Sequence, residues 1–209
     1  MAVSNWVTTL AIIWAGLSAT EVVGALLGLV YVVLVIGQVR ACWVAALLST
    51  AVYLSVFYRA GLYMQAALQG YYMVVAVYGF WAWRATPAGT ALPISRASWQ
   101  VQAMGVLAVL VASVLTARWL AAETGSADPL LDSLTTWGSV FATWLVAKKK
   151  IDNWPWWLVI DSLILVLCWR AHLYPSLILY ALYLALVLIG WRQWEIDWHR
   201  QSATSTEAA

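Results

Sequence analysis

The 209-residue chain is 64% hydrophobic and only 10% charged, with a formal net charge of +2. Soluble domains are about 45–50% apolar and about 25% charged, so this composition excludes a cytosolic enzyme, a nucleic-acid binder and a disulfide-stapled secreted module. At about 20 residues per crossing, the chain can hold about seven membrane helices. We therefore predict an all-α integral membrane protein in a lipid bilayer.

Seven apolar runs, each bounded by charged residues, glycine or proline, predict the membrane-spanning helices. In chain order they cover residues 20–38, 41–58, 61–83, 99–120, 130–147, 154–170 and 173–193. The apolar stretch 6–17 is too short to span a bilayer, and we interpret it as an interfacial or re-entrant helix. Residues 201–209 are small and polar, which predicts a disordered tail.

The distribution of lysine and arginine predicts the orientation of the chain in the membrane. The connections after the first, third and fifth helices, together with the C-terminal segment, carry eight of the eleven basic residues, among them the run Lys148–Lys150. The opposite side carries only Arg59, Arg118 and Arg170. Because basic residues concentrate in cytoplasmic loops, we expect the C-terminus in the cytoplasm and the start of the first helix outside.

The chain also contains an internal repeat. A shift of 111 positions without a gap aligns identical residues of several types, which apolar composition alone does not explain. The aligned pairs include Trp43 with Trp154, Arg59 with Arg170, Tyr72 with Tyr183, Gly79 with Gly190 and Trp83 with Trp194. The shift spans an even number of crossings, so both halves enter the membrane from the same side. This predicts a parallel repeat of three helices, one linker helix and three helices.

The repeat sets the predicted organisation of the chain. Its parts are an interfacial segment 1–19, a first bundle 20–83, a linker 84–129, a second bundle 130–194 and a cytoplasmic tail 195–209. Transporters built from such repeats hold their substrate between the halves, near the middle of the bilayer. Duplication for stability alone is the alternative interpretation.

Polar residues follow one face of the predicted helix 130–147. Asp132, Thr136, Ser139 and Thr143 recur at helical spacing, and Thr135 borders them. A polar stripe is costly beside lipid, so we expect it to face the protein interior. A substrate path and hydrogen bonding between helices are equally compatible with this stripe.

The predicted helix 154–170 carries a more specific pattern. Trp154, Trp157 and Asp161 fall on one face, and Asp161 lies about 10 Å of helical rise inside Trp154. Indole rings offer flat faces to aromatic rings and cations, and a carboxylate offers charge or two acceptors. A carboxylate at this depth predicts a substrate-binding role, and a structural pair with Arg170 is the alternative.

Other aromatic and polar residues are divided between the site and the membrane interface. Gln69 lies two turns into the third helix, where its amide could contact a polar ligand group, and the tyrosines Tyr72 and Tyr183 add aromatic surface. Tryptophans near helix ends are interpreted as interface anchors. They include Trp81, Trp83, Trp191, Trp194 and Trp198.

The sequence lacks the motifs of membrane enzymes and pumps. His172 and His199 are isolated from other metal ligands, and Cys42 and Cys168 are interpreted as buried structural residues. There is no Walker-type loop, nucleophile elbow or dinucleotide fingerprint. We therefore expect neither an enzyme nor a metal or cofactor site, and facilitated diffusion is the economical mechanism.

Motifs from both halves follow one another in the order of a known family. They are Leu62–Tyr63, Leu68–Gln69, Tyr78–Trp83, Asp132–Ser133, Lys148–Lys150 and Asn153–Trp154. With them the chain resembles, from about residue 20 to 194, the PnuC family of vitamin transporters in the bacterial inner membrane. The resemblance implies a seven-helix plan similar to that of sugar-transporting SWEET proteins, facilitated diffusion of nicotinamide riboside that is trapped by intracellular phosphorylation, and a homotrimer.

One position departs from the pattern of the nicotinamide riboside transporters. Those members carry Trp-x-x-Trp-x-x-x-Asn, whereas here the last position is Asp161, as in thiamine-transporting relatives called PnuT. The resemblance implies that Trp154 and Trp157 are stacking walls, that Asp161 contacts the polar group of the substrate and that Gln69 lies opposite. Because the aminopyrimidine of thiamine prefers a carboxylate acceptor, we expect thiamine ahead of nicotinamide riboside, and riboflavin third.

Three classes of function stay open at this point. The first is an ATP-independent vitamin transporter, and the second is a vitamin-binding subunit that needs a separate ATPase. The third is a purely structural membrane protein, which would bind no small molecule.

Overall fold

The computed structural model describes residues 18–59, 63–84, 92–123, 128–170 and 173–207. These residues form seven helices, and each overlaps one of the seven predicted runs. The helices are α2 (Ala19–Ile36), α3 (Cys42–Arg59), α4 (Tyr63–Ala82), α5 (Trp99–Glu123), α6 (Pro129–Ala147), α7 (Asn153–Arg170) and α8 (Tyr174–Glu207). The all-α prediction is confirmed for the described residues, and the interfacial helix predicted at 6–17 lies outside them.

Four of these helices are long and apolar enough to cross a membrane by length and composition. They are α2, α3, α5 and the part of α8 from Ser176 to Ala203. The other three, α4, α6 and α7, have 20, 19 and 18 residues and lie below the mean hydropathy of these four. Several polar side chains of α6 and α7 are buried, including Thr135, Ser139, Thr143 and Asp161. Their polarity therefore faces the protein rather than its surface.

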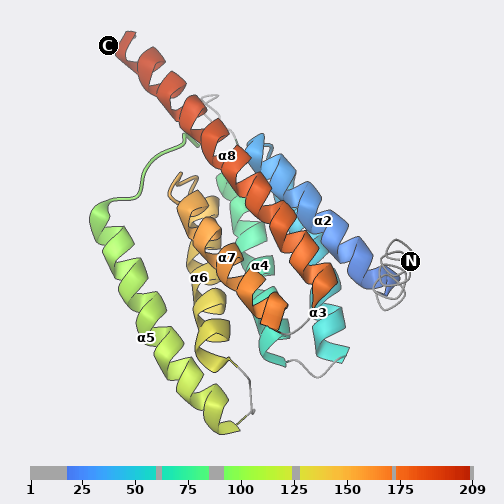
Figure 1. Cartoon of the computed structure of the whole chain (residues 1–209). Helices are drawn as coiled ribbons and strands as arrows, with labels where there is room; N and C mark the ends of the chain where they lie inside the picture. The colour runs from blue at the N-terminus through green and yellow to red at the C-terminus, as the bar shows by residue number, and fades with distance from the viewer. Residues whose placement is uncertain (1–17, 60–62, 85–91, 124–127, 171–172, 208–209) are drawn as a thin grey trace, which may run out of the picture.

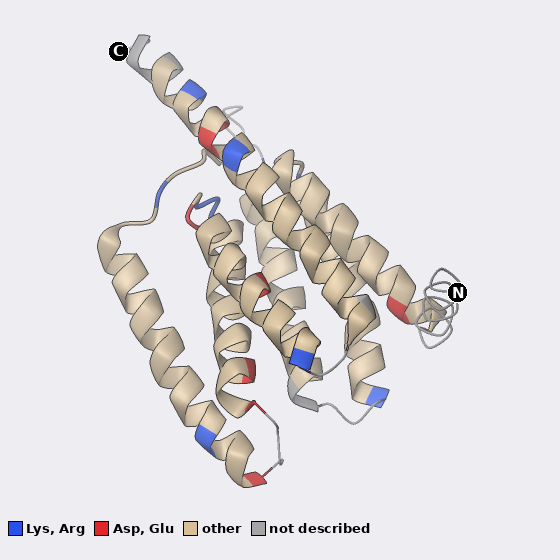
Figure 2. Cartoon of the chain, in the orientation of Figure 1, with Lys and Arg blue, Asp and Glu red and all other residues tan. Residues whose placement is uncertain are grey.

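The helices pack as two consecutive groups with α5 outside them (Figure 1). Helices α2, α3 and α4 contact one another in chain order and make up the first half, and α6, α7 and α8 do the same in the second half. The halves meet where α2 contacts α8 and where α4 contacts α6, while α5 packs on α6. We call the end of the molecule at the α6–α7 turn, Lys148–Lys150, the lysine end. Figure 2 shows charged residues gathered mainly toward the ends of the helices.

Helix α8 extends beyond the other helices (Figure 1) and continues to Glu207, so the predicted disordered tail is wrong over most of its length. Contacts with the connection before α5 stabilise this extension. The side chain of Gln201 accepts a hydrogen bond from the Ile94 N–H at 3.2 Å, and Arg96 forms an ion pair with Glu195. Tertiary contacts of this kind override a weak local helix preference.

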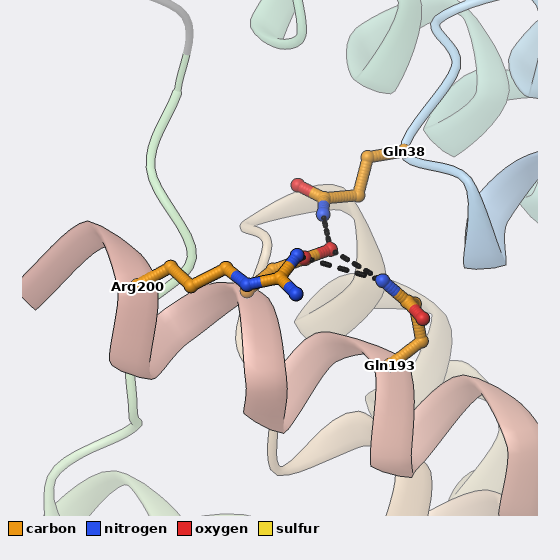
Figure 3. Close-up of polar contacts among 4 residues, drawn as sticks. Gln38, Gln193 and Arg200 are labelled. Carbon is orange, nitrogen blue, oxygen red and sulfur yellow. Dashed lines mark hydrogen bonds and ion pairs between the residues drawn. The ribbon is translucent and has the colours of Figure 1, made fainter.

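A polar cluster at the lysine end joins the turns of both halves to α8. Gln38 and Lys149 occupy equivalent positions in the two turns, and both have positive φ angles, of 55° and 49°. Lys149 Nζ donates to Gln38 Oε1 at 3.3 Å, and Gln38 Nε2 donates to Asp197 Oδ2 at 2.8 Å. Figure 3 shows Gln193 directed at the same carboxylate, with Arg200 beside it. Burial lowers the pKa of Lys149, because the ammonium loses hydration.

Each half contains the same close contact between a glycine and a tryptophan. A Cβ atom on Gly79 of α4 would lie 2.3 Å from a ring carbon of Trp43, and one on Gly190 of α8 would lie 2.3 Å from a ring carbon of Trp154. Glycine is required at both positions because any side chain would overlap the indole. The two contacts occupy positions that the 111-residue shift aligns.

Substituting Gly190 with alanine is expected to lower the free energy of unfolding by about 1–3 kcal/mol, the usual cost of overpacking a dense contact. The matched control is Gly70→Ala in α4, where a Cβ would meet nothing within 4 Å. Alanine favours a helix over glycine, so the control should keep or raise the thermal midpoint. Thermal unfolding of both variants in detergent measures the difference. Equal midpoints would show that the indole contact does not restrict this position.

Two tryptophans interpreted as interface anchors belong to the core instead. Trp83 is 5% exposed and Trp194 is 0% exposed, whereas Trp81 is 58% exposed. The interface prediction is therefore wrong for Trp83 and Trp194. Trp83 directly follows α4 and Trp194 lies within α8, where the halves meet, and both indoles pack there against protein rather than lipid.

Candidate functional site

A cavity of about 230 Å³ lies between the two halves. Its lining comes from α2, α3 and α4 on one side and from α6, α7 and α8 on the other. The lining is mainly apolar and aromatic with a few polar groups, which is typical of small-molecule sites.

The lining residues occur in pairs that the 111-residue shift relates. Seven pairs have both members on the cavity. They are Gly28 with Ser139, Val32 with Thr143, Val35 with Val146, Trp43 with Trp154, Ala46 with Trp157, Thr50 with Asp161 and Tyr72 with Tyr183. The cavity therefore lies between equivalent surfaces of the two halves.

The two surfaces differ in chemistry although their positions match. In three of the pairs the second half has a polar or aromatic side chain where the first half has a smaller or apolar one. Ser139 aligns with Gly28, Thr143 with Val32, and Trp157 with Ala46. In a fourth pair, Asp161 aligns with Thr50. The first half thus contributes smaller side chains at these positions, and the second half contributes most of the polar side chains of the lining.

In the part of the chain that the structure describes, Asp161 is the one acidic side chain that lines this cavity. It is 3% exposed and, among the described residues, forms no ion pair. Its alternative partner Arg170 instead pairs with Asp128, with Nη1 and Oδ1 2.8 Å apart, so the structural pair suggested by the sequence is wrong. A buried carboxylate without a cation in the protein is suited to a ligand that brings a positive charge or N–H donors.

Aromatic rings line the same cavity as this carboxylate. They include Trp157, Tyr72, Tyr180 and Tyr183. A Cβ on Gly28 would lie 2.6 Å from the hydroxyl oxygen of Tyr183, so the glycine makes room for that phenol ring. Flat ligands can stack on such rings, and a cation above them gains further attraction.

Six of the nine residues predicted for the site line the cavity, and three do not. The six are Trp154, Trp157, Asp161, Ser139, Tyr72 and Tyr183, and the three are Gln69, Thr135 and Thr136. Thr135 and Thr136 lie further from the lysine end of α6 than Ser139. Thr135 donates its hydroxyl to the Asp132 carbonyl at 2.9 Å, within its own helix. Gln69 aligns with Tyr180, whose longer side chain reaches the cavity.

Four further residues that line the cavity were not assigned to the site from the sequence, namely Trp43, Asn153, Tyr31 and Tyr180. A signal for two of them was present in the repeat. Trp43 aligns with the predicted Trp154, and Tyr180 aligns with the predicted Gln69. Applying the shift to each predicted residue would have found both.

The described residues contain no group of three or more histidine, cysteine or acidic side chains that could hold a metal ion. Cys42 and Cys168 are both buried and free of disulfides, as predicted. Trp156, beside the predicted pair, turns to α5, where its Nε1 donates to Gln102 at 2.9 Å. These residues therefore act in packing, away from the cavity.

A cavity between two similar helical halves is the arrangement of small-molecule carriers. The fold and the site together define a multi-pass membrane transporter. The model of the nicotinamide mononucleotide transporter family matches residues 18–196, and the chain belongs to this family, which includes PnuC.

Relatives of known name cover most of the chain. The riboflavin/roseoflavin transporter RibM of Streptomyces davaonensis is 29% identical over 216 residues, covering 98% of this chain and 99% of that protein. The nicotinamide riboside transporter PnuC of Escherichia coli is 24% identical over 204 residues, covering 85% of each. The crystal structure of the vitamin B3 transporter PnuC matches with a TM-score of 0.72 and 25% identity, covering 93% of this chain and 88% of that one.

Proposed function

We propose that the chain carries a cationic aromatic vitamin, thiamine first, across the membrane without ATP. The observation that supports this most directly is Asp161, a buried carboxylate that lines an aromatic cavity and has no ion pair among the described residues. An ionised carboxylate is costly inside a membrane protein unless a partner arrives. A cationic substrate supplies that partner at the moment of binding.

Thiamine matches the groups of this cavity at two places. Its thiazolium ring carries the positive charge and can stack on Trp157 or a tyrosine. Its aminopyrimidine presents N–H donors, which Asp161 can accept. The aspartate also stands where the family resemblance places it in thiamine transporters.

Riboflavin is the second candidate because RibM matches nearly the whole chain. Its flat ring suits the same aromatic walls, and its ring N–H could donate to Asp161, but it brings no cation. Nicotinamide riboside is the third candidate because PnuC matches most of the chain. It carries a pyridinium cation and a carboxamide donor. In the family pattern of nicotinamide riboside transporters, however, an asparagine occupies the position of Asp161.

Transport proceeds by alternating access between the first bundle, 20–83, and the second, 130–194, joined by the linker 84–129. The repeated lining pairs support a parallel repeat of three, one and three helices, similar to that of SWEET proteins. At the lysine end the halves exchange hydrogen bonds. Trp83 Nε1 donates to the Ala147 carbonyl, and Trp194 Nε1 donates to the Val35 carbonyl, each at 3.1 Å. These bonds close that end and must break for it to open.

The basic residues favour a bacterial inner membrane with the lysine end and the segment 195–209 in the cytoplasm. The segment 1–19 then lies on the periplasmic side. Family resemblance favours a homotrimer of such units. A vitamin-binding subunit that depends on a separate ATPase is the alternative, and it predicts that the chain alone moves no substrate.

Reconstitution in proteoliposomes tests the mechanism. We expect labelled thiamine to equilibrate across the vesicle membrane with no ATP and no ion gradient, and empty vesicles to show only slow leakage. Unlabelled thiamine, riboflavin and nicotinamide riboside added as competitors would rank the three candidates. Flux that needs ATP or a proton gradient would exclude facilitated diffusion, and competition by riboflavin alone would exclude thiamine.

A further inference from the structure

A chain of side-chain contacts crosses between the two halves at the lysine end. The Asp197 carboxylate of α8 accepts a hydrogen bond from Gln38 Nε2 at 2.8 Å (Figure 3), and Gln38 Oε1 accepts one from Lys149 Nζ at 3.3 Å. The Lys149 ammonium also lies 4.8 Å from the centre of the Trp83 ring. Gln38 and Trp83 belong to the first half, and Lys149 and Asp197 belong to the second. Each contact in this chain therefore joins opposite halves.

The chain is centred on two positions that the internal repeat relates. Gln38 and Lys149 are 111 residues apart, and each lies in the turn between the first two helices of its half. Their φ angles of 55° and 49° are in the left-handed region, which residues other than glycine rarely adopt. Such strain is kept where surrounding contacts or function require it. Here both strained turns carry a long polar side chain, and the two side chains meet each other.

The second half contacts the amide of Gln38 on both sides. An amide offers donors and an acceptor, so it can bind a carboxylate and an ammonium at once. Gln193 Nε2 donates to the same Asp197 carboxylate at 3.2 and 3.3 Å, but this contact lies within α8. Gln193 therefore orients Asp197, whereas Gln38 connects Asp197 and Lys149 to the first half.

The Lys149 ammonium has partners that compensate its burial only in part. Its side chain is 6% exposed and forms no ion pair within the described ranges. The contacts of its ammonium with the first half are a neutral amide oxygen and an aromatic ring. A buried charge of this kind gains hydration when water reaches it. Separation of the halves would therefore lose contacts and regain hydration, which brings the closed and open arrangements closer in free energy.

We propose that Gln38, Lys149 and Asp197 form a latch that holds the lysine end closed, and that their separation opens this end during transport. None of the three is among the residues that line the cavity, so they act on the gate rather than on the substrate. The latch adjoins the cavity wall through Trp83, which packs edge-on against the lining residue Trp43 with ring centroids 5.3 Å apart. The proposal rests on the proposed function only in taking this opening as a step of transport.

A native thiol can report the opening. Cys42 is 0% exposed, and its thiol interacts electrostatically with the Lys149 ammonium of the opposite half. Separation of the halves at this end would uncover it to N-ethylmaleimide. Cys168 lies near the other end of α7, is 5% exposed and serves as the internal reference. Mass spectrometry of the ligand-free protein in detergent would measure the labelling rate of each thiol separately.

Gln38→Ala removes both hydrogen bonds of the amide. We expect it to raise the labelling rate of Cys42 roughly tenfold, because that rate follows the population of the open arrangement, and to leave Cys168 unchanged. Gln193→Ala is the matched control, since it removes a glutamine bonded to the same carboxylate from within α8. Its rate at Cys42 should stay within about twofold of the unaltered protein. An unchanged rate in Gln38→Ala, or an equal rise in Gln193→Ala, would overturn the proposal.

An exchange of the amide and the carboxylate separates the latch from a general loss of stability. Gln38→Glu turns one carboxylate against another and should speed the labelling of Cys42. Adding Asp197→Asn restores a donor opposite an acceptor and should slow the labelling again, as an interaction energy in a double-mutant cycle. Labelling that stays fast in the double variant would overturn the latch. Vesicles that move none of the three vitamins would instead overturn the proposed function, and the labelling rates would still decide whether the latch exists.

Discussion

Replacing Asp161 with asparagine is expected to weaken thiamine binding by about 2–5 kcal/mol, a factor of roughly 30 or more in Kd. The amide has nearly the same shape as the carboxylate but carries no charge to attract the thiazolium. Its NH₂ group also opposes the donors of the aminopyrimidine. The affinity for nicotinamide riboside should fall less or rise, because the family pattern of its transporters has asparagine at this position. Quenching of indole fluorescence during titration with each vitamin measures the change in preference.

The matched control is Asp132→Asn in α6. Asp132 is also an acidic residue of a membrane helix, but it is not among the residues that line the cavity. Its substitution should leave the order of the three vitamins unchanged. If Asp161→Asn also leaves that order unchanged, then Asp161 does not discriminate between substrates, and the argument for thiamine is lost.

The helices could be predicted because the membrane permits few alternatives. A backbone in lipid must satisfy its own hydrogen bonds, so every long apolar run becomes a helix. The run 61–83 became Tyr63–Ala82, and the run 154–170 became Asn153–Arg170. The extension of α8 to Glu207 was missed because it depends on contacts with the connection before α5, which are distant in sequence.

The candidate site could be predicted only in part, because helical spacing gives the face of a helix and not the depth of a cavity. Asp132, Thr136, Ser139 and Thr143 share a face, yet only Ser139 and Thr143 line the cavity. These two lie level with the first turns of α7, where Trp154 and Asp161 stand, because α6 and α7 are joined by a short turn. The other two lie further from that turn.

The tryptophans show the same restriction. A tryptophan near the end of an apolar run can be an interface anchor or an indole packed between two bundles, and the sequence position is the same for both. Trp83 and Trp194 were therefore assigned to the interface. The repeat held the missing information, since it aligns these residues with each other and aligns the glycines and tryptophans around them. A tryptophan that only anchors the chain in the membrane interface would not need to recur in both halves beside the same buried glycine–tryptophan contact.

Replacing Trp194 with alanine is expected to lower the free energy of unfolding by about 3–5 kcal/mol, as for other fully buried large aromatic residues. The indole is 0% exposed, packs against Trp83 and Trp154, and donates to the Val35 carbonyl at 3.1 Å. The substitution therefore removes a large apolar contact and one hydrogen bond between the halves. Thermal unfolding in detergent, without ligand, measures the loss.

Trp169→Ala in α7 is the control for the change in residue size, because Trp169 is 65% exposed. Its midpoint should fall much less than that of Trp194→Ala, and equal falls would show that the burial of Trp194 does not stabilise the fold. Trp194→Phe separates the two contributions to the larger effect. It keeps a six-membered ring but loses the five-membered ring with its N–H, so it should cost more than the ~0.5–1.5 kcal/mol of one hydrogen bond and less than the alanine variant. A cost near that of alanine would mean that the bond between the halves, rather than the packing of the ring, holds the lysine end together.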